Sequence, residues 1–153
     1  MKKLFCSFII CLLGLLAITS CGNDDEKFEG LEFDTQGVIL STRSGNNYYG
    51  EIKSIGGDIT ITAKGKNSIN GLLSQFKVND FMYEVTDKDW QQSFPYTICS
   101  KDWGNVELVS KTPYSIRIHL NENNTDNSIN YMLTFGGGYK TSSILLTQFT
   151  TAR

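Results

Sequence analysis

The chain has 153 residues, with 14 Lys and Arg against 16 Asp and Glu, which gives a formal net charge of −2. This balance excludes the strongly basic face that a phosphate backbone requires, so we expect no nucleic-acid partner. The length suits one domain of ordinary size once a targeting segment is set aside.

Residues 1–20 predict a signal peptide. Lys2 and Lys3 supply a positive start, and the apolar stretch over 4–18 is too short and too interrupted for a membrane span of about 20 residues. It ends in Ile18-Thr19-Ser20-Cys21, which resembles the lipobox of bacterial lipoproteins. The resemblance implies that Cys21 receives lipid and begins the mature chain. The alternative is an ordinary secretory signal followed by a free cysteine.

Residues 21–34 are expected to form an acidic, flexible tether. The run Asp24-Asp25-Glu26 can be interpreted as part of a solvated spacer, but it also resembles the surface-export signal of Bacteroidetes lipoproteins. Two or three acyl chains on Cys21 would make membrane attachment stable. We therefore expect an outer-membrane lipoprotein exposed at the cell surface, with a periplasm-facing position as the alternative.

Cysteine usage leaves one thiol in the mature chain. Cleavage before Cys21 would remove Cys6 and Cys11, and lipidation would use Cys21 itself, so Cys99 would remain. A single cysteine cannot form a disulfide within the chain, and it offers no zinc-binding spacing. Because Cys99 lies between aromatic and aliphatic neighbours, we interpret it as a small buried side chain instead of a nucleophile.

Residues 35–153 predict an all-β domain, because apolar and polar residues alternate along most of this range. Clusters of Gly, Asn and Ser separate the alternating segments and predict turns. The pattern favours an immunoglobulin-like antiparallel β-sandwich of about eight strands, although 65–75 could contain one helical turn. The predicted strands lie at 37–42, 58–64, 75–78, 81–87, 105–109, 114–121, 129–135 and 142–149.

Four segments of this domain together resemble a BACON domain, an immunoglobulin-like module common in Bacteroidetes surface proteins. They are Gly56 to Thr62, Trp103 leading into Val106-Glu107-Leu108, Ile116 to Asn121, and Ile144 to Gln148. The resemblance implies a β-sandwich that associates with carbohydrate or mucin, or that serves as a spacer.

The residue inventory does not support an enzyme. His119, the only histidine, alternates outward from a predicted strand and has no evident triad partner. A glycosidase could use paired carboxylates, but acids near turns are usually just solvated. We therefore expect no catalytic residue and no cofactor. The acids available for such a pair are Asp87, Asp89, Asp102 and Glu107.

Two loops invite ligand-binding interpretations that their sequences do not sustain. Residues 121–127 supply oxygen atoms that calcium could use, but they lack the central glycine and terminal glutamate of an EF-hand. A polar turn is favoured, and no metal site is expected. Gly136 to Gly138 lie between two strands and do not open a helix, so they indicate a hairpin turn and not a phosphate-binding loop.

Aromatic residues beside polar turns are the candidate ligand contacts. Sugars present flat C–H faces that stack on exposed rings, and loops often carry binding residues. Trp90 and Tyr96 lie in a predicted loop, and Tyr48 and Tyr49 follow a polar turn. Trp103, in contrast, is predicted to be buried in the sandwich.

These features together predict a non-catalytic, membrane-anchored lipoprotein that binds carbohydrate or a protein at the cell surface. The alternative is a structural spacer or a subunit of an envelope protein complex.

Overall fold

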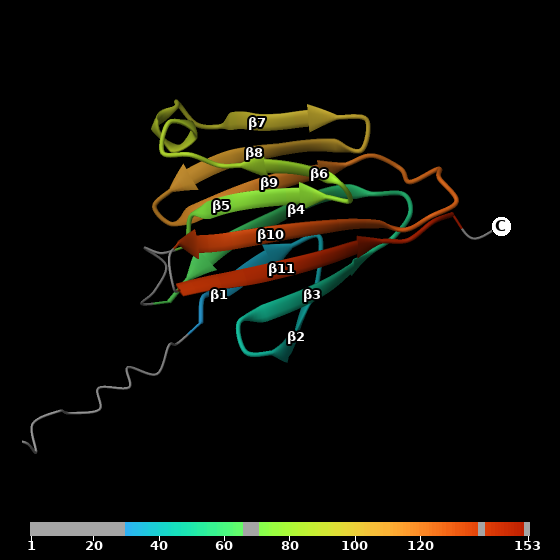
Figure 1. Cartoon of the computed structure of the whole chain (residues 1–153), viewed down its shortest axis with the longest axis horizontal. Coiled ribbons are helices and arrows are strands. Elements are labelled where there is room, and N and C mark those ends of the chain that lie inside the picture. Colours follow the sequence, from blue (N-terminus) through green and yellow to red (C-terminus); the bar gives the residue numbers. More distant parts are fainter. Residues whose placement is uncertain (1–29, 66–70, 138–139, 152–153) are drawn as a thin grey trace, which may run out of the picture.

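The computed structural model describes residues 30–65, 71–137 and 140–151, and these ranges form two packed β-sheets of eleven strands (Figure 1). The predicted signal peptide, Cys21 and most of the predicted tether lie outside the described residues, so those assignments stay predictions. No helix in the described part of the chain is long and apolar enough to cross a membrane.

One sheet has five strands, and every neighbouring pair in it is antiparallel. Its strands, in spatial order, are β1 (Glu32–Gln36), β4 (Gly57–Lys64), β9 (Tyr114–Leu120), β8 (Gly104–Lys111) and β7 (Tyr96–Lys101).

The other sheet has six strands and contains one parallel pair, β3 with β11, among antiparallel ones. Its strands, in spatial order, are β2 (Leu40–Ser44), β3 (Asn47–Ile52), β11 (Lys140–Gln148), β10 (Ile129–Gly137), β5 (Leu73–Val78) and β6 (Phe81–Glu84).

The predicted all-β sandwich is confirmed, but the described chain has eleven strands where about eight were expected. The three strands that the sequence did not predict are β1, β3 and β7. Strand β3 was missed because Gly50 occupies an inward position of its alternating pattern. A Cβ atom on Gly50 would lie 2.7 Å from Val38 Cγ2 and 2.8 Å from Leu146 Cδ2, so this close packing favours glycine.

The predicted tether ends too late in the chain. Glu32, Phe33 and Asp34 pair with β4 in the five-stranded sheet, and the Phe33 ring lies 4.7 Å from that of Phe135. Acidic residues at alternate positions gave this strand the composition of a spacer. Burial of the intervening Phe33 explains why the segment pairs as a strand.

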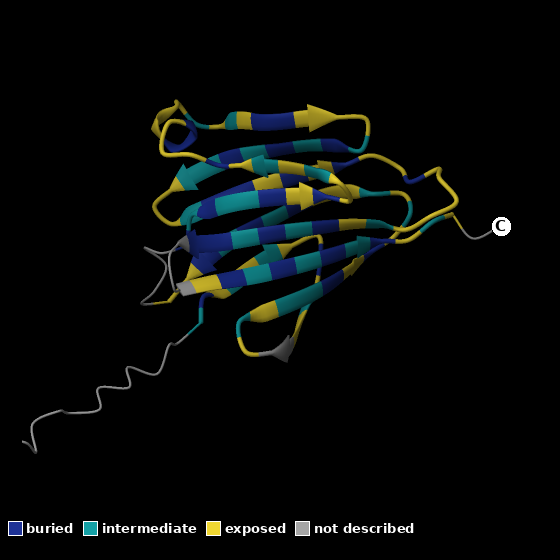
Figure 2. Ribbon diagram, in the orientation of Figure 1, coloured by how far each residue is buried: buried dark blue, intermediate teal, exposed yellow. Residues whose placement is uncertain are grey.

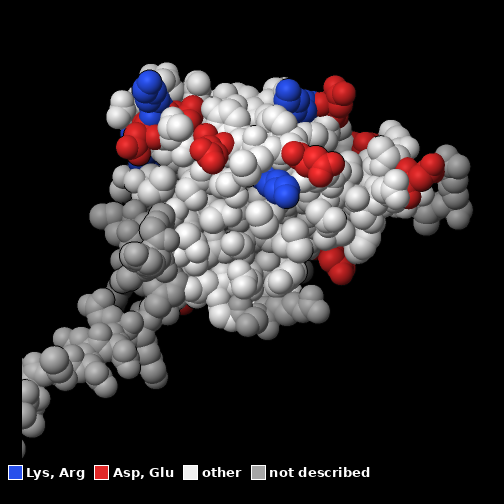
Figure 3. Space-filling model, in the orientation of Figure 1, with Lys and Arg blue, Asp and Glu red and all other residues white. Residues whose placement is uncertain are grey.

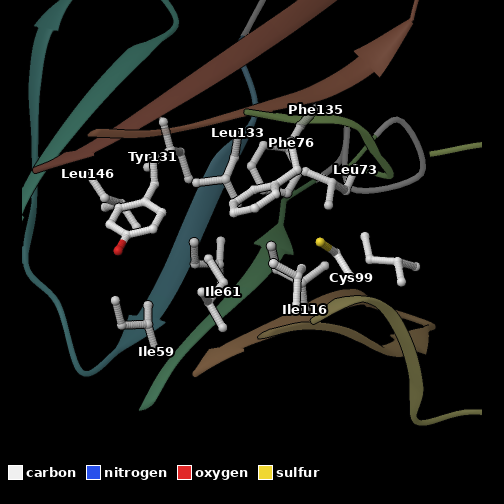
Figure 4. Close-up of a cluster of buried hydrophobic side chains, with 14 of the residues drawn as sticks. Ile59, Ile61, Leu73, Phe76, Cys99, Ile116, Tyr131, Leu133, Phe135 and Leu146 are labelled. Carbon is white, nitrogen blue, oxygen red and sulfur yellow. The ribbon is translucent and has the colours of Figure 1, made fainter. Parts of the chain in front are cut away.

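The core lies between the sheets and is built from the inward positions of both (Figures 2 and 4). Ile59, Ile61 and Ile116 from one sheet are 1–2% exposed, and Leu133 and Leu146 from the other are fully buried. The alternation predicted for 58–64, 114–121 and 129–135 thus matches the observed burial, except at Ser115, which was expected to face outward but is 8% exposed.

Cys99 is buried in this core, as predicted, with 7% of its surface exposed. Burial raises the pKa of its thiol, although the nearby Lys101 acts in the opposite direction. A raised pKa keeps the sulfur protonated at neutral pH, which disfavours a role as a nucleophile.

A buried amide closes the core at one end of the sandwich. Gln148 Oε1 accepts a hydrogen bond of 2.8 Å from Tyr131 Oη, and Gln148 Nε2 donates to Ser54 O at 3.0 Å and to Asn121 O at 2.8 Å. Both side chains are fully buried, and burial raises the pKa of Tyr131 to about 12. The phenol therefore stays protonated and remains a donor.

The loop over 121–127 is a polar turn organised by Asn123, which is 2% exposed. Asn123 Oδ1 accepts hydrogen bonds from Thr125 N and Thr125 Oγ1, and Asn123 Nδ2 donates to Asn127 O. The backbone N–H of Asn123 donates to Ser54 O at 2.7 Å, which ties this loop to the turn between β3 and β4. Asn123 Oδ1 is thus engaged by hydrogen bonds from Thr125 within the same loop.

Candidate functional site

The outer face of the five-stranded sheet is covered by its own ion pairs. The three ion pairs between described residues all lie here: Lys64 with Asp34, Arg117 with Glu107, and His119 with Asp58. Two of them join residues directly opposite each other on neighbouring strands. Opposite charges in this position, as in Arg117 and Glu107, stabilise the sheet modestly, and His119 shares a 2.8 Å hydrogen bond with Asp58.

The outer face of the six-stranded sheet is different, because its middle is mostly uncharged (Figure 3). Met132 on β10 lies opposite Leu145 on β11, and Leu145 lies opposite Tyr49 on β3. All three side chains are half-buried. They form an apolar row across three strands, which we call the Tyr49 row.

Hydroxyl and amide side chains border the Tyr49 row on both sides. Thr134, Ser143 and Asn47 form the next outward set along the strands, and Asn130 and Thr147 form the set on the other side. Thr147 Oγ1 donates a 2.9 Å hydrogen bond to Asn130 Oδ1. Two exposed charged residues also adjoin the row, because Glu51 lies opposite Thr147 and Lys77 lies opposite Met132. This face therefore combines an apolar strip with hydroxyl and amide groups and with one charge of each sign at its borders.

At Tyr49 the row runs into an open groove of about 820 Å³. The groove lies where the chain passes from β1 to β2 and where β3 ends, and Gly37 allows this passage with a φ of +83°. Apolar and polar side chains both contribute to the walls. The lining residues are Thr35, Gly37, Val38, Ile39, Ser41, Tyr49, Gly50, Glu51, Ile52, Lys53 and Gly56.

Four aromatic residues were predicted to contact a ligand, and of these Tyr49 lines the groove. Tyr48, its neighbour, packs against the core and donates a 2.6 Å hydrogen bond to Leu31 O. Desolvation, with a smaller contribution from Glu32, raises the pKa of Tyr48. Strand alternation separates these adjacent tyrosines, because successive side chains point to opposite faces of a sheet.

Trp90, predicted as a loop aromatic that contacts a ligand, is buried and presents almost no surface to solvent. Its side chain is 4% exposed, and its indole Nε1 donates a 3.1 Å hydrogen bond to Leu73 O. The ring also lies 5.0 Å from that of Tyr114 in an edge-on contact. A short 3₁₀ turn, Asp89–Gln91, folds the predicted loop back so that this indole closes the end of the sandwich.

Asp89 fixes that turn. Its carboxylate accepts hydrogen bonds of 2.8 Å from Thr86 N and Thr86 Oγ1, and one of 3.1 Å from Tyr83 Oη. Burial by itself would raise the pKa of this carboxyl, but the hydrogen bonds outweigh it, so the pKa lies below its ordinary value. Asp89 is therefore a buried structural acid and not one member of an exposed catalytic pair.

Tyr96 and Trp103 are both half-buried and pack against the core. Trp103 was predicted to be buried, and its ring lies 5.3 Å from that of Phe76 and 5.9 Å from that of Tyr131. Tyr96 begins β7, at an edge of the five-stranded sheet and away from the groove. The structure thus does not bring the predicted aromatics together.

Met132 and Leu145 are candidate binding residues that the sequence reasoning did not select. The sequence feature that could have identified them is an apolar residue at an outward position of a strand whose other outward residues are polar. Recognising the row also required the pairing of β3 with β11, which lie about 90 residues apart in the chain.

Comparisons with known proteins assign no family to this chain. No protein-family model matches it, and no curated protein matches it. A solved structure described as the NMR structure of the protein from Bacteroides thetaiotaomicron is similar with a TM-score of 0.49 and 14% identity, over 82% of this chain and 94% of the other. A likeness at this level carries no argument about function.

Proposed function

We propose that this protein is a membrane-anchored lipoprotein whose β-sandwich binds a carbohydrate at the cell surface without catalysis. The observation that carries the proposal is the groove at Tyr49, together with the apolar Tyr49 row that adjoins it.

The lining of the groove suits a sugar ring. Tyr49 offers an aromatic face, and Ile39, which is 91% exposed, adds apolar surface on which C–H groups can pack. Ser41 and Glu51 can accept hydrogen bonds from sugar hydroxyls, while Lys53 can donate to them. A shallow, open groove with this mixed lining fits a pyranose ring or a short chain of them.

The anchor follows from the sequence at Cys21. Nine residues, 22–30, would separate the lipidated cysteine from the folded domain, which allows a reach of at most ~30 Å. A domain held this close to the membrane suits the capture of polymers near the cell surface. We place it at the outer face of the outer membrane, on the basis of the acidic run after Cys21.

Binding without catalysis is supported by the environments of the titratable residues. The described residues contain no group of three or more His, Cys, Asp and Glu side chains arranged to hold a metal. His119 is exposed and hydrogen-bonded to Asp58, and Asp89 is committed to a turn. Glu51 is the one carboxylate that lines the groove.

Glycan arrays, followed by titration calorimetry on the best ligand, test the proposal. Tyr49→Ala should weaken binding at least tenfold, whereas Tyr49→Phe should retain most of it because the ring is kept. Arg117→Ala, on the opposite face, is the matched control and should leave affinity unchanged. The sugar site is refuted if no glycan binds, or if Tyr49→Ala binds as tightly as the native chain.

A separate experiment tests the anchor and its side of the membrane. Cys21→Ser should move the protein from the membrane fraction to the soluble fraction, and mass spectrometry should find diacylglycerol on Cys21 of the native chain. Protease treatment of intact cells should then remove the domain. Full protection would indicate the periplasmic side and would count against capture of external glycans.

A further inference from the structure

We propose that the outer face of the six-stranded sheet binds an extended inner segment of a β1,4-linked polysaccharide chain, which lies across all six strands. The inference rests on the proposed sugar-binding function and deepens it, because it names the form of the ligand and a contact area far from the groove. It is drawn from the register of the strands, the unused polar groups beside the Tyr49 row, and the position of the row's two ends.

The Tyr49 row continues in register to both edges of the sheet. At one end Ser41 on β2 lies opposite Tyr49. At the other end Met132 lies opposite Lys77 on β5, which lies opposite Met82 on β6. Four strand spacings, or about 19 Å, separate Tyr49 from Met82, which is 52% exposed. We call the whole line the long row: Ser41, Tyr49, Leu145, Met132, Lys77 and Met82.

Lys77 places a charge within the long row without interrupting the contact surface. Its side chain is exposed between Met132 and Met82, and the three ion pairs between described residues do not include it. The aliphatic stem of a lysine can cover apolar surface while its ammonium group stays in water. Lys77 can therefore extend the apolar strip and also donate hydrogen bonds to the hydroxyls of a bound chain.

Four uncharged polar side chains run beside the long row, one on each of four neighbouring strands. They lie two residues along each strand from the row, a distance of about 7 Å. No hydrogen bond joins these side chains to another described residue, whereas Thr147 and Asn130, on the other border, bond to each other. Their donors and acceptors are available to a ligand. The four are Asn47, Ser143, Thr134 and Gln75.

This combination of an apolar strip and a polar border matches a sugar chain. A pyranose ring has C–H groups on its faces and hydroxyls at its edges, so it can pack on the long row while its hydroxyls reach the border. In a β1,4-linked chain, equatorial bonds keep the rings extended, and the repeat is close to the spacing of neighbouring strands. One ring per strand therefore stays in register along the row.

A second copy of the chain suits the same face less well. A stable protein interface buries roughly 800 Å² on each partner and has an apolar core from which Lys and Ser are depleted. The long row has four apolar side chains, with Lys77 among them. Two copies packed face to face would also bury the unused polar groups of Ser143 and Thr134 without partners, which costs free energy. A polysaccharide supplies those partners.

Both ends of the long row lie on edge strands, β2 and β6. A bound chain can therefore continue past either edge, which suits an inner segment of a long polymer. The strands fan out across this face in Figure 1, and neighbouring strands of a sheet are rotated by about 20°. The row therefore winds, so a single dissolved chain can follow it, whereas chains packed in a crystalline fibre cannot.

Titration calorimetry of the detergent-solubilised, full-length lipoprotein tests the inference. The probes are β1,4-linked gluco-, xylo- and manno-oligosaccharides of two to six rings. In at least one series, affinity should rise at least tenfold from the disaccharide to the pentasaccharide and change little beyond it. Met82→Ala should weaken pentasaccharide binding about fivefold and leave disaccharide binding unchanged. The matched control, Ile55→Ala, removes an exposed apolar side chain outside the row and should change neither.

Tyr49→Ala should weaken the binding of both lengths. The inference is overturned if affinity is independent of chain length, if Met82→Ala affects both lengths equally or neither, or if microcrystalline cellulose retains the protein as strongly as dissolved chains bind it. A dimer in sedimentation that Met82→Ala dissociates would also overturn it.

Two outcomes separate this inference from the proposed function. A disaccharide site that depends on Tyr49 without a gain from longer chains, or binding confined to other linkages on the glycan array, would overturn the inference and leave the sugar-binding function intact. Failure to bind any glycan would overturn both.

Discussion

The two outer faces of the sandwich carry different kinds of side chains. On the five-stranded sheet, Arg117 pairs with Glu107 and His119 pairs with Asp58 across neighbouring strands. On the six-stranded sheet, the corresponding middle positions hold Met132, Leu145 and Tyr49. One face satisfies its polar groups within the protein, and the other leaves apolar surface half-exposed. The difference is the reason that the proposed binding site lies on the six-stranded sheet.

The first prediction concerns the inner side of the six-stranded sheet and has the largest expected effect. Gln148→Ala should lower the free energy of unfolding by about 3 kcal/mol, because Tyr131 Oη and two carbonyls lose their buried partner and a cavity forms. Urea denaturation measures this loss. Thr147→Ala, one residue earlier and facing outward, should cost about 0.5 kcal/mol. Equal losses at the two positions would contradict the assigned burial.

The second prediction concerns the outer side of the same sheet. Leu145→Lys should weaken sugar binding at least tenfold, about 1.4 kcal/mol, because a charge would interrupt the Tyr49 row. Its free energy of unfolding should fall by less than about 1 kcal/mol, since the stem of a lysine can cover the strand. Titration calorimetry and urea denaturation of one preparation measure both effects. Retained binding would restrict the site to the groove.

The third prediction concerns the turn that joins the two sheets between β6 and β7. Asp89→Asn should lower stability by about 1 kcal/mol at neutral pH, because the amide accepts the bonds from Thr86 and Tyr83 less well. The pKa of Asp89 is lowered in the folded protein, so its contribution is complete above about pH 4 and is lost as the pH falls through the folded value.

Denaturation of both proteins at pH values from about 2 to about 7, an interval that spans the ordinary pKa of a carboxyl, measures this effect. The difference between native chain and variant should shrink at the acidic end. A constant difference across the range would mean that the charge of Asp89 contributes nothing.

The smallest effect is expected on the five-stranded face. Arg117→Ala removes an exposed ion pair and should cost at most about 1 kcal/mol, with less effect at high salt. Sugar affinity should remain that of the native chain. Loss of binding in this variant would reverse the assignment of the two faces, so it is the sharpest single check on the comparison.

Much of the fold could be predicted from alternation alone. The strands over 58–64, 114–121 and 129–135 alternate cleanly, and their inward residues form the core as expected. Three strands were missed because their alternation was hidden. Acidic residues hid it in β1, the inward Gly50 hid it in β3, and the neighbouring loop hid it in β7. For β1 and β3 the pairing partner is distant in the chain, whereas β7 pairs with the next strand, β8.

The candidate site could be predicted only in part. Tyr48 and Tyr49 were indistinguishable next to the same polar turn, and the register of β3 decided that Tyr49 faces the groove while Tyr48 faces the core. Trp90 was misassigned because loop composition does not reveal that a 3₁₀ turn carries the indole inward. Local polarity indicates a loop, but it does not indicate which way a side chain of that loop points.

The sequence by itself determined the all-β class, the inward residues of the regular strands and the burial of Cys99, because alternation and burial are local consequences of strand geometry. Only the tertiary structure decided that Tyr49, Leu145 and Met132 form one row and that Tyr48 packs with the core. Those groupings depend on which distant strands pair and in what register, and a one-residue shift would turn each side chain to the other face.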